Sequence, residues 1–590
     1  MVGGAAVTEE VIPGYHFSRA SYVYGMFRPH IVDDLRLSSR GLRLLPRVPS
    51  SFTPGDGVGA PSLTLGGGAA FDAAQIAQFS ARDAAAYPRY CAWLDRFASA
   101  LRPLYDAPPP DPYAIADVSA PWRRRLGNAL YLMATAGRVA SALGTQTAGT
   151  PFRHNNHYRY RNPIMPPTPP PPPPQIPELP HFLTSSAAGV LNRWFDSDVL
   201  KATLATDAVI GSVAPPSGAQ TAYVLLHHCM ATWYNVAGGM GALTRAIAGA
   251  ATEAGCEVRT GARVKTITAN EDGGTGVELA SGERLRAGVV VANVDPHTTL
   301  TQLLEAGAAA GVAPATRRHM ESTDLRSGGV KINVALDALP RFVCALPKHD
   351  GAGGADAGTP AHLRGTIHFE HSMAALEAAA ADAAAGRPSA TPLVEMTVPT
   401  VLDPALAPPD KHVALLFCQY APYAPRNAAT GAPGSWDDAG ARDAFADRVF
   451  AVIERAAPGF TASVVGRDIL TPLDLERTFG LPRGNIFHSA MSLDQLYWNR
   501  PVPGAAQYRS PVPGLYWASA GTHPGGGVIG AAGHNAAMQV LADGGETPDA
   551  LSRISSGFRN GAPEGHIPAA LGAAGAAGGG ARWRHRTPLR

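Results

Sequence analysis

The sequence predicts a mixed α/β protein, and three observations support this prediction. Residues 238–295 read in order as a helix, a strand, a hairpin and an apolar strand. Residues 515–541 read as a strand, a glycine-rich turn and a helix. The chain has 590 residues, of which 45% are hydrophobic, so its length suits two closely packed domains better than a single core.

The first of these regions has the order of half a dinucleotide-binding fold. Glycines in residues 238–241 open an apolar helix at 242–251, and a turn and strand follow at 256–264. Two more strands are expected at 264–269 and 276–279, with a turn at 271–274 between them. The last strand, at 288–293, is wholly apolar, which predicts a strand buried in a parallel sheet.

Other segments predict helices and a second sheet. Residues 71–102 and 192–211 have the apolar spacing of helices. Residues 331–336 alternate polar with apolar side chains, which predicts a half-buried strand. Further strands of the same sheet are expected at 367–370, 393–398 and 412–419.

Three low-complexity segments should lie outside the core. Residues 163–180 contain an unbroken run of six prolines, which favours extended polyproline. Residues 351–360 are a Gly/Ala loop, and residues 561–590 form an Ala/Gly-rich tail with a basic end. We assign no function to these segments.

Composition argues against several classes of partner. Lys and Arg number 49 against 47 acidic residues, so the net charge of +2 gives no reason to expect nucleic acid. No window approaches the roughly 20 apolar residues of a membrane span. The five cysteines lie far apart, without a CxxC pair, which fits a reducing compartment better than a redox disulfide or a zinc site.

No metal site is expected from the histidines. His154 and His157 have ligand-like spacing, but they lie in the irregular approach to the proline segment. His227 and His228 are adjacent, so in a strand they would face opposite ways and could not share a metal ion. We interpret these two as core or surface histidines.

The most informative segment is residues 514–537, where three successive glycines follow a strand and precede a helix. Glycine lets the backbone approach a bulky or phosphorylated ligand, and free N–H groups at a helix start favour negative charge. A plain glycine loop is the alternative. The flanking strand and helix favour a binding turn.

This segment resembles the closing motif of the phytoene desaturase-like FAD-dependent oxidoreductases, GA(G/S)xHPGGGVxGA, which residues 520–531 match. The likeness is greatest to the pyridine nucleotide-disulphide oxidoreductase domain-containing protein 2 group. It extends to residues 3–18, 201–211, 330–336 and 464–500. The resemblance implies an α/β fold with a discontinuous FAD-binding Rossmann-like domain and an α+β substrate domain.

The resemblance also implies the domain boundaries. The FAD-binding parts would be residues 1–50, 226–300 and 481–545. The helical substrate region would be residues 51–225, with a disordered Pro-rich insertion at 151–185. The mixed-sheet substrate domain would be residues 301–480, and residues 561–590 would be a disordered tail.

Individual cofactor-binding residues follow from the same resemblance. Gly3 and Gly4 would lie near the flavin ribose and pyrophosphate, and the Val264 backbone would meet the adenine. His523 is a catalytic candidate that could touch substrate or ring, and the alternative is a structural hydrogen bond that shapes the turn. His488 is a further candidate for the same contact. The closing turn would place Gly521 near the pyrophosphate and would place Gly526, Gly527, Val528 and Ile529 near the isoalloxazine.

The sequence departs from this family at its start. Family members begin with a strand, a Gly-x-Gly-x-x-Gly turn, a helix and a second strand, whereas Met1 falls where that unit ends. We therefore expect a truncated N-terminal βαβ unit. Residues 228–238 also look shorter than in relatives, so errors of gene prediction are our interpretation of both features and of the proline insertion.

The implied activity is hydride transfer from a substrate C–H or N–H bond to FAD, which requires no side-chain nucleophile. The substrate would be small and hydrophobic, the location the mitochondrial matrix, and a mitochondrial protein partner could exist. Two alternatives stay open: a flavin-free interaction protein on the same fold, and a redox-neutral isomerase that uses reduced flavin.

Overall fold

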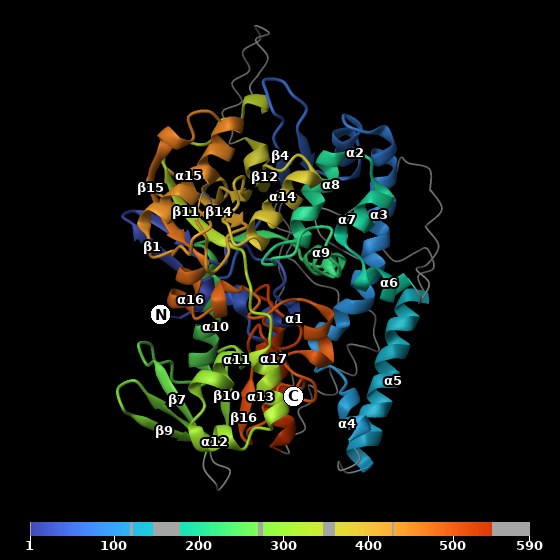
Figure 1. Ribbon diagram of the computed structural model, residues 1–590, viewed down its shortest axis with the longest axis vertical. Coiled ribbons are helices and arrows are strands. Elements are labelled where there is room, and N and C mark those ends of the chain that lie inside the picture. Colours follow the sequence, from blue (N-terminus) through green and yellow to red (C-terminus); the bar gives the residue numbers. More distant parts are fainter. Residues whose placement is uncertain are drawn as a thin grey trace, which may run out of the picture.

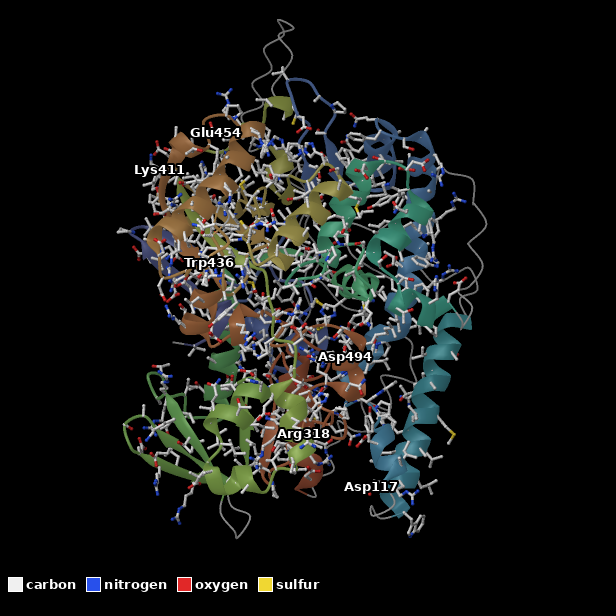
Figure 2. The ribbon with its side chains drawn as sticks, viewed as in Figure 1. Asp117, Arg318, Lys411, Trp436, Glu454 and Asp494 are labelled. Carbon is white, nitrogen blue, oxygen red and sulfur yellow. The ribbon has the colours of Figure 1, made fainter. Side chains whose placement is uncertain are left out.

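The computed structural model describes residues 2–117, 122–144, 178–269, 275–345, 360–427 and 430–544. A large sheet and its helices occupy one end of the molecule, and two small sheets occupy the other end (Figure 1). Charged side chains such as Asp117 and Asp494 are exposed, whereas Trp436 is buried and its Nε1 donates to the Pro422 carbonyl at 2.8 Å (Figure 2).

The large sheet has seven strands in the order β15-β11-β14-β13-β12-β4-β5. It confirms that the strands expected at 331–336, 367–370, 393–398 and 412–419 share one sheet. It also takes in two strands from near residue 60, so the sheet joins distant parts of the chain. The bounds are β4 (Ser51–Thr53), β5 (Leu63–Leu65), β11 (Val330–Leu336), β12 (Thr366–His368), β13 (Leu393–Thr397), β14 (His412–Gln419) and β15 (Val464–Leu470).

Strand β11 is buried along its whole length, so the prediction of a half-buried strand was wrong. On one face its apolar residues pack in a cluster with α15 (Ala439–Ala456). On the other face the hairpin β1–β2 (Thr8–Ile12 and Tyr15–Ser18) covers the sheet, with Tyr15 and Phe17 against Ala335. The polar residues of the alternating pattern therefore face a protein layer and not solvent.

The helix expected at 71–102 is two helices, α2 (Ala69–Ala77) and α3 (Ala81–Leu101), because Ser80 caps the second one. The single helix expected at 192–211 was also wrong. Helix α7 (Ala187–Trp194) ends before α8 (Asp198–Ala205), since the buried Asp83 carboxylate accepts the N–H groups of Asp196 and Ser197 at 2.7–3.0 Å.

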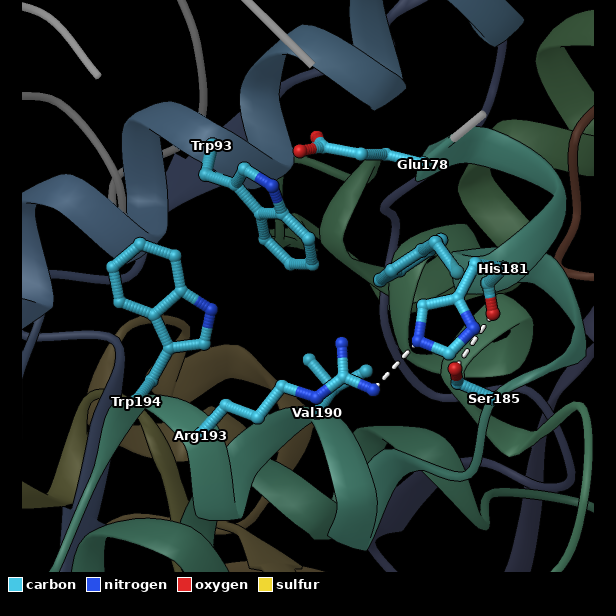
Figure 3. A pocket seen from close by; sticks show the side chains of 8 residues that line it. Trp93, Glu178, His181, Ser185, Val190, Arg193 and Trp194 are labelled. Carbon is cyan, nitrogen blue, oxygen red and sulfur yellow. Dashed lines mark hydrogen bonds between the residues drawn. The ribbon is translucent and has the colours of Figure 1, made fainter. Parts of the chain in front are cut away.

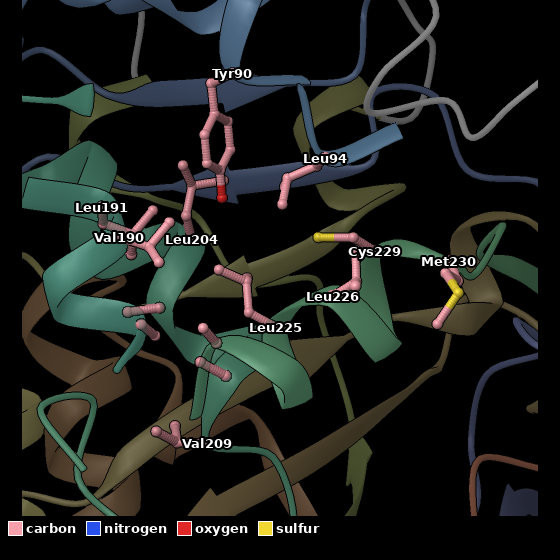
Figure 4. Packing of buried hydrophobic residues seen from close by; sticks show 14 of the residues in the cluster. Tyr90, Leu94, Val190, Leu191, Leu204, Val209, Leu225, Leu226, Cys229 and Met230 are labelled. Atoms are coloured by element: carbon pink, nitrogen blue, oxygen red, sulfur yellow. The ribbon is translucent and has the colours of Figure 1, made fainter. Parts of the chain in front are cut away.

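These helices enclose the largest apolar core. Leu94 of α3, Leu191 of α7 and Leu204 of α8 pack around Leu225 of α9 (Thr221–Cys229), as Figure 4 shows. Helix α6 (Glu178–Thr184) joins this core through the buried Phe182. The disordered insertion predicted at 151–185 is therefore wrong over residues 178–184.

The other end of the molecule holds the parts expected to bind the cofactor. Helix α10 (Met240–Glu253), the antiparallel sheet β7–β8–β9 and the parallel pair β10–β16 lie there (Figure 1). The predicted parallel pairing of the strand near 290 is confirmed, but its burial was wrong. Val291 is 48% exposed, because the described part of this sheet has two strands. Bounds are β7 (Val264–Ala269), β8 (Thr275–Leu279), β9 (Arg284–Ala287), β10 (Val290–Ala292) and β16 (Leu515–Trp517).

The remaining elements connect these units. Residues 256–263 form no strand, so the strand expected at 256–264 begins at Val264. The proline run, most of the loop 351–360, the tail 561–590, the turn at 271–274, His154 and His157 all lie outside the described residues. Other bounds are β3 (Leu44–Pro46), β6 (Tyr234–Val236), α1 (Pro29–Asp34), α4 (Pro112–Ala116), α5 (Trp122–Gly144), α11 (Pro296–Thr298), α12 (Ala306–Ala310), α13 (Pro314–Glu321), α14 (Met373–Ala384), α16 (Pro472–Phe479) and α17 (Ala531–Asp543).

Candidate cofactor site

The carboxyl ends of β10 and β16 meet at one edge of the parallel pair, which is where α/β sheets place their ligands. Chain segments that follow the two strands are in contact there. A Cβ built on Gly521 would lie 2.4 Å from Cδ of Pro296, so only glycine allows this approach. Beside it the buried Asp295 has one carboxylate oxygen, Oδ2, without a hydrogen-bond partner.

The turn after β16 has an unusual backbone. Gly527 has φ 119°, Val528 has φ 53° and Gly530 has φ 76°. The helix after this turn was expected to start near Val528. These left-handed conformations prevent that, and α17 begins at Ala531. A β-branched residue with positive φ is strained, and such strain persists where the surroundings fix it.

Four successive backbone N–H groups in this turn are free. Within the described part of the chain, the N–H groups of residues 526–529 donate to no acceptor. Gly526 and Ile529 are buried, and buried N–H groups are nearly always paired in folded proteins. Helix α17 follows with no side-chain cap, so its first-turn N–H groups extend the same donor surface.

The glycines of the turn are packed by protein side chains. A Cβ on Gly525 would lie 2.8 Å from Sδ of Met491, and one on Gly527 would lie 2.9 Å from Sδ of Met26. A Cβ on Gly526 would meet Phe487 at 2.5 Å. The interpretation that these glycines make room for a ligand is therefore incomplete. Protein side chains fill the space where each Cβ would lie, so it is the backbone N–H groups that are left to contact a ligand.

Arg500 holds this turn in place. It is fully buried, and its guanidinium donates to the carbonyls of Ala520 and Thr522 on either side of Gly521. It also donates to three further carbonyls, and no carboxylate among the described residues pairs with it. Burial lowers its pKa to about 10, so it stays charged at neutral pH. The turn thus has a desolvated positive charge directly behind it.

His227 holds the turn from the other side. Its Nε2 lies 3.0 Å from the Gly526 carbonyl and its Nδ1 lies 2.8 Å from the Tyr105 hydroxyl. Because a carbonyl only accepts, Nε2 carries the proton and Nδ1 accepts from Tyr105. Burial lowers the pKa of His227 to about 3, which keeps it neutral.

His227 and His228 lie in helix α9 and not in a strand. Both are buried, which agrees with the interpretation as core histidines. His228 donates from Nδ1 to the Asp207 carbonyl at 2.7 Å. Each histidine therefore has its own backbone acceptor.

The catalytic candidate His523 makes a structural hydrogen bond. Its Nε2 donates to the Leu104 carbonyl at 2.7 Å, and its Nδ1 is buried without a partner. Burial lowers its pKa to about 4, so Nδ1 is an unprotonated acceptor at neutral pH. His488 is half-buried, with a buried, unpartnered Nδ1, φ 65° and a pKa lowered by desolvation to about 4.

The other residues expected to bind the cofactor, Gly3, Gly4 and Val264, lie outside the closing turn. Val528 packs against the apolar cluster that contains Ala6 and residues of α10, so the closing turn and the segment after Gly3 and Gly4 share one cluster. Gly3 has φ 115° and lies against Thr244 of α10, whereas Gly4 is exposed and has nothing near its Cβ position. Val264 packs instead with the cluster beneath β16.

Three residues that support the turn were not predicted from the sequence. Arg500 is the last residue of the matched stretch 464–500, but nothing in the sequence showed that it donates to the carbonyls of the turn. Tyr105 and Met26 had no local signal, because each reaches the turn from a distant part of the chain.

FAD is the cofactor that the resemblance implies, and the described residues fit it. The free N–H groups of 526–529, the uncapped α17 and the buried cation Arg500 suit a group that carries phosphates and a ring carbonyl. The unpartnered Asp295 Oδ2 and His523 Nδ1 are further polar atoms that a ligand can satisfy. By the resemblance, the residues that would hold it are those of the turn together with Gly3 and Gly4.

No described helix combines the length and the apolar character that crossing a membrane requires. No three metal-ligating side chains of the described residues gather in one place. All five cysteines are free thiols.

Comparison with known proteins defines the class first. The family model for flavin containing amine oxidoreductases matches residues 184–327, and the chain is of the flavin-containing oxidoreductase class. It is 43% identical to "Pyridine nucleotide-disulfide oxidoreductase domain-containing protein 2" of Rattus norvegicus over 558 residues, which covers 92% of this chain and 88% of the relative. The chain belongs to the pyridine nucleotide-disulfide oxidoreductase domain-containing protein 2 family.

More distant similarities were also found. A "Phytoene desaturase (lycopene-forming)" of Pseudescherichia vulneris is 27% identical over 318 residues, which covers 53% of this chain and 57% of that enzyme. Among solved structures, a triple mutant of putrescine oxidase has a TM-score of 0.49 and 13% identity, with 94% of this chain and 91% of that chain covered.

Proposed function

We propose that the protein is an FAD-dependent oxidoreductase that removes a hydride from a small, apolar substrate. The chemistry that FAD supplies when bound is acceptance of a hydride from a substrate C–H or N–H bond. The observation that carries this proposal is the run of four free N–H groups at 526–529 with the buried Arg500 behind it. Family membership supports the same cofactor.

In this proposal the protein binds, orients and excludes water. Arg500 fixes the carbonyls on both sides of Gly521, so the neighbouring N–H groups are held in one direction. Phe487 and Met26 pack against the turn and keep water from its glycine side. His227 holds a proton at Nε2 and adds no charge beside the turn.

An apolar substrate is favoured over a charged amine. A relative is a phytoene desaturase by name, and phytoene is a hydrocarbon. Histidines 227, 488 and 523 near the turn all have pKa values lowered by burial, which indicates a weakly hydrated environment. Desolvating an ammonium group there would cost free energy.

The test is anaerobic mixing of the flavin-loaded protein with phytoene, with putrescine or with buffer alone. We expect phytoene to bleach the flavin absorbance and putrescine to leave it unchanged. Dithionite serves as the control that the bound flavin is reducible. Bleaching by putrescine alone would refute the apolar substrate, and a flavin that only dithionite reduces would refute hydride transfer from this class.

We also propose residence in the mitochondrial matrix, on the basis of the family resemblance. Five free cysteines without a disulfide fit a reducing compartment. The test is protease protection of the native protein in isolated mitochondria. Digestion before the inner membrane is opened would contradict a matrix location.

A further inference from the structure

A cavity of about 350 Å³ opens between helices α3, α6 and α7 (Figure 3). The elements that form it differ from β16 and α17, which carry the closing turn. The cavity is therefore separate from the proposed flavin site.

The wall of this cavity is aromatic. Trp93 of α3 and Trp194 of α7 have ring centroids 5.7 Å apart and planes tilted by 50°. Phe182 of α6 is buried and packs edge-on against Trp93 at 5.2 Å. Two indoles at this angle form an angled apolar wall, so a planar ligand can stack on the face of one ring while its edge meets the other.

The opposite side of the cavity is a hydrogen-bond donor surface. Arg193 Nη2 lies 2.6 Å from His181 Nε2 (Figure 3). Because a guanidinium only donates, Nε2 of His181 accepts, and this neutral ring carries its proton on Nδ1. In the described part of the chain, no acceptor takes that Nδ1–H or the other N–H groups of Arg193.

Glu178, the one carboxylate among the described residues that line the cavity, does not cancel this donor surface. Glu178 points toward the Trp93 side and away from Arg193 (Figure 3). Its charge acts on Arg96: burial lowers the pKa of Arg96, and Glu178 opposes that shift. Arg193 has no ion-pair partner among the described residues, so it is the charge available to a ligand.

We propose that this cavity binds a planar organic anion, with its ring against Trp93 and Trp194 and its carboxylate on the Arg193 guanidinium. The fork of N–H groups on Arg193 matches a carboxylate, which a single ammonium would not. The site is independent of the proposed flavin site, so the ligand binds whether or not flavin is present.

The experiment is isothermal titration of the full chain with cinnamate, a planar aromatic carboxylate, and with cinnamamide, its neutral analogue of the same shape. We expect cinnamate to bind and Arg193→Gln to weaken it about tenfold, which corresponds to one charge-assisted hydrogen bond. Trp194→Ala should weaken it similarly by removing half of the aromatic wall. Cinnamamide should bind the unsubstituted protein as weakly as cinnamate binds the Arg193→Gln protein.

The matched control is Arg341→Gln, an exposed arginine outside the cavity, which should leave cinnamate binding unchanged. Melting curves and flavin content of each variant separate loss of this site from loss of the fold or of the cofactor. Equal binding of cinnamamide and cinnamate, an Arg193→Gln protein that binds as tightly as the unsubstituted protein, or no binding of cinnamate would each overturn the proposal.

Discussion

At the scale of single residues, the closing turn depends on two buried side chains that donate to backbone carbonyls. Arg500 uses a buried charge to satisfy five carbonyls, and His227 uses its neutral tautomer to satisfy a sixth. Buried carbonyls without donors are costly. The turn keeps its left-handed backbone because these neighbours fix its ends.

Substituting Arg500 with Met should destabilise the fold by about 3 kcal/mol or more, because several buried carbonyls lose their donor at once. Urea unfolding measures this change. The control is Arg341→Met at an exposed site, which should change the free energy of unfolding by less than about 0.5 kcal/mol. Equal effects of the two substitutions would show that Arg500 does not clamp the turn.

Two glycines of this segment make a matched pair. Gly527→Ala should cost about 1–3 kcal/mol, since residue 527 has φ 119° and its Cβ would lie 2.9 Å from Sδ of Met26. Gly533→Ala should add about 0.5–1 kcal/mol of stability, because Gly533 is helical and nothing lies within 4 Å of its Cβ position. Thermal melts of the two variants should therefore shift in opposite directions, and shifts in the same direction would contradict the backbone described for this turn.

Glu395 provides a test by pH. Burial, with the charges of Asp207 and Glu370, raises its pKa from 4.5 to about 8. The folded protein keeps this proton between these pH values while the unfolded chain releases it, so the group lowers stability as pH rises from about 4.5 to about 8. Glu395→Gln does not titrate, and its stability relative to the unsubstituted protein should rise across this window by about 1 kcal/mol per pH unit.

The measurement for Glu395 is urea unfolding at several pH values, with the exposed Glu321→Gln as control. Below pH 4.5 the Glu395→Gln and unsubstituted proteins should differ little. A stability difference that is constant with pH would mean that the Glu395 carboxyl is not held protonated.

At the scale of elements, long-range contacts decided where helices and strands differ from their patterns. The apolar spacing of 192–211 is that of a helix, yet the helix is interrupted at Asp196. The Asp83 carboxylate of α3 accepts the backbone N–H groups of Asp196 and Ser197 there. The alternation of β11 is that of a half-buried strand, yet a hairpin from the N-terminal segment buries its polar face. Neither partner is visible in the local sequence.

Asp83→Ala should cost about 2–3 kcal/mol, because the N–H groups of Asp196 and Ser197 lose a charged acceptor. Hydrogen exchange at residues 196 and 197 should accelerate more than exchange in the core of α3. The control Asp34→Ala removes an exposed carboxylate at the end of α1 and should have little effect. If both variants unfold at the same urea concentration, Asp83 does not set the break between α7 and α8.

At the scale of the whole molecule, the sequence predicted the class, a parallel strand near residue 290, and the turn between β16 and α17; that the parallel partner is the strand at 515 came from the structure. These features depend on local patterns and on a motif that is continuous in the chain. The support of the turn could not be predicted, since Met26, Tyr105 and His227 reach it from separate segments. The motif thus predicted the backbone of the turn, whereas the side chains that hold the turn in place depend on tertiary packing.

The most direct test of the central claim is the FAD content of the purified full chain, measured by chromatography of the released cofactor and compared with protein concentration. We predict about one FAD per chain, retained by Gly533→Ala and lost by Gly527→Ala under conditions in which both variants remain folded. A folded, colourless protein that takes up no FAD when the cofactor is added would contradict the account.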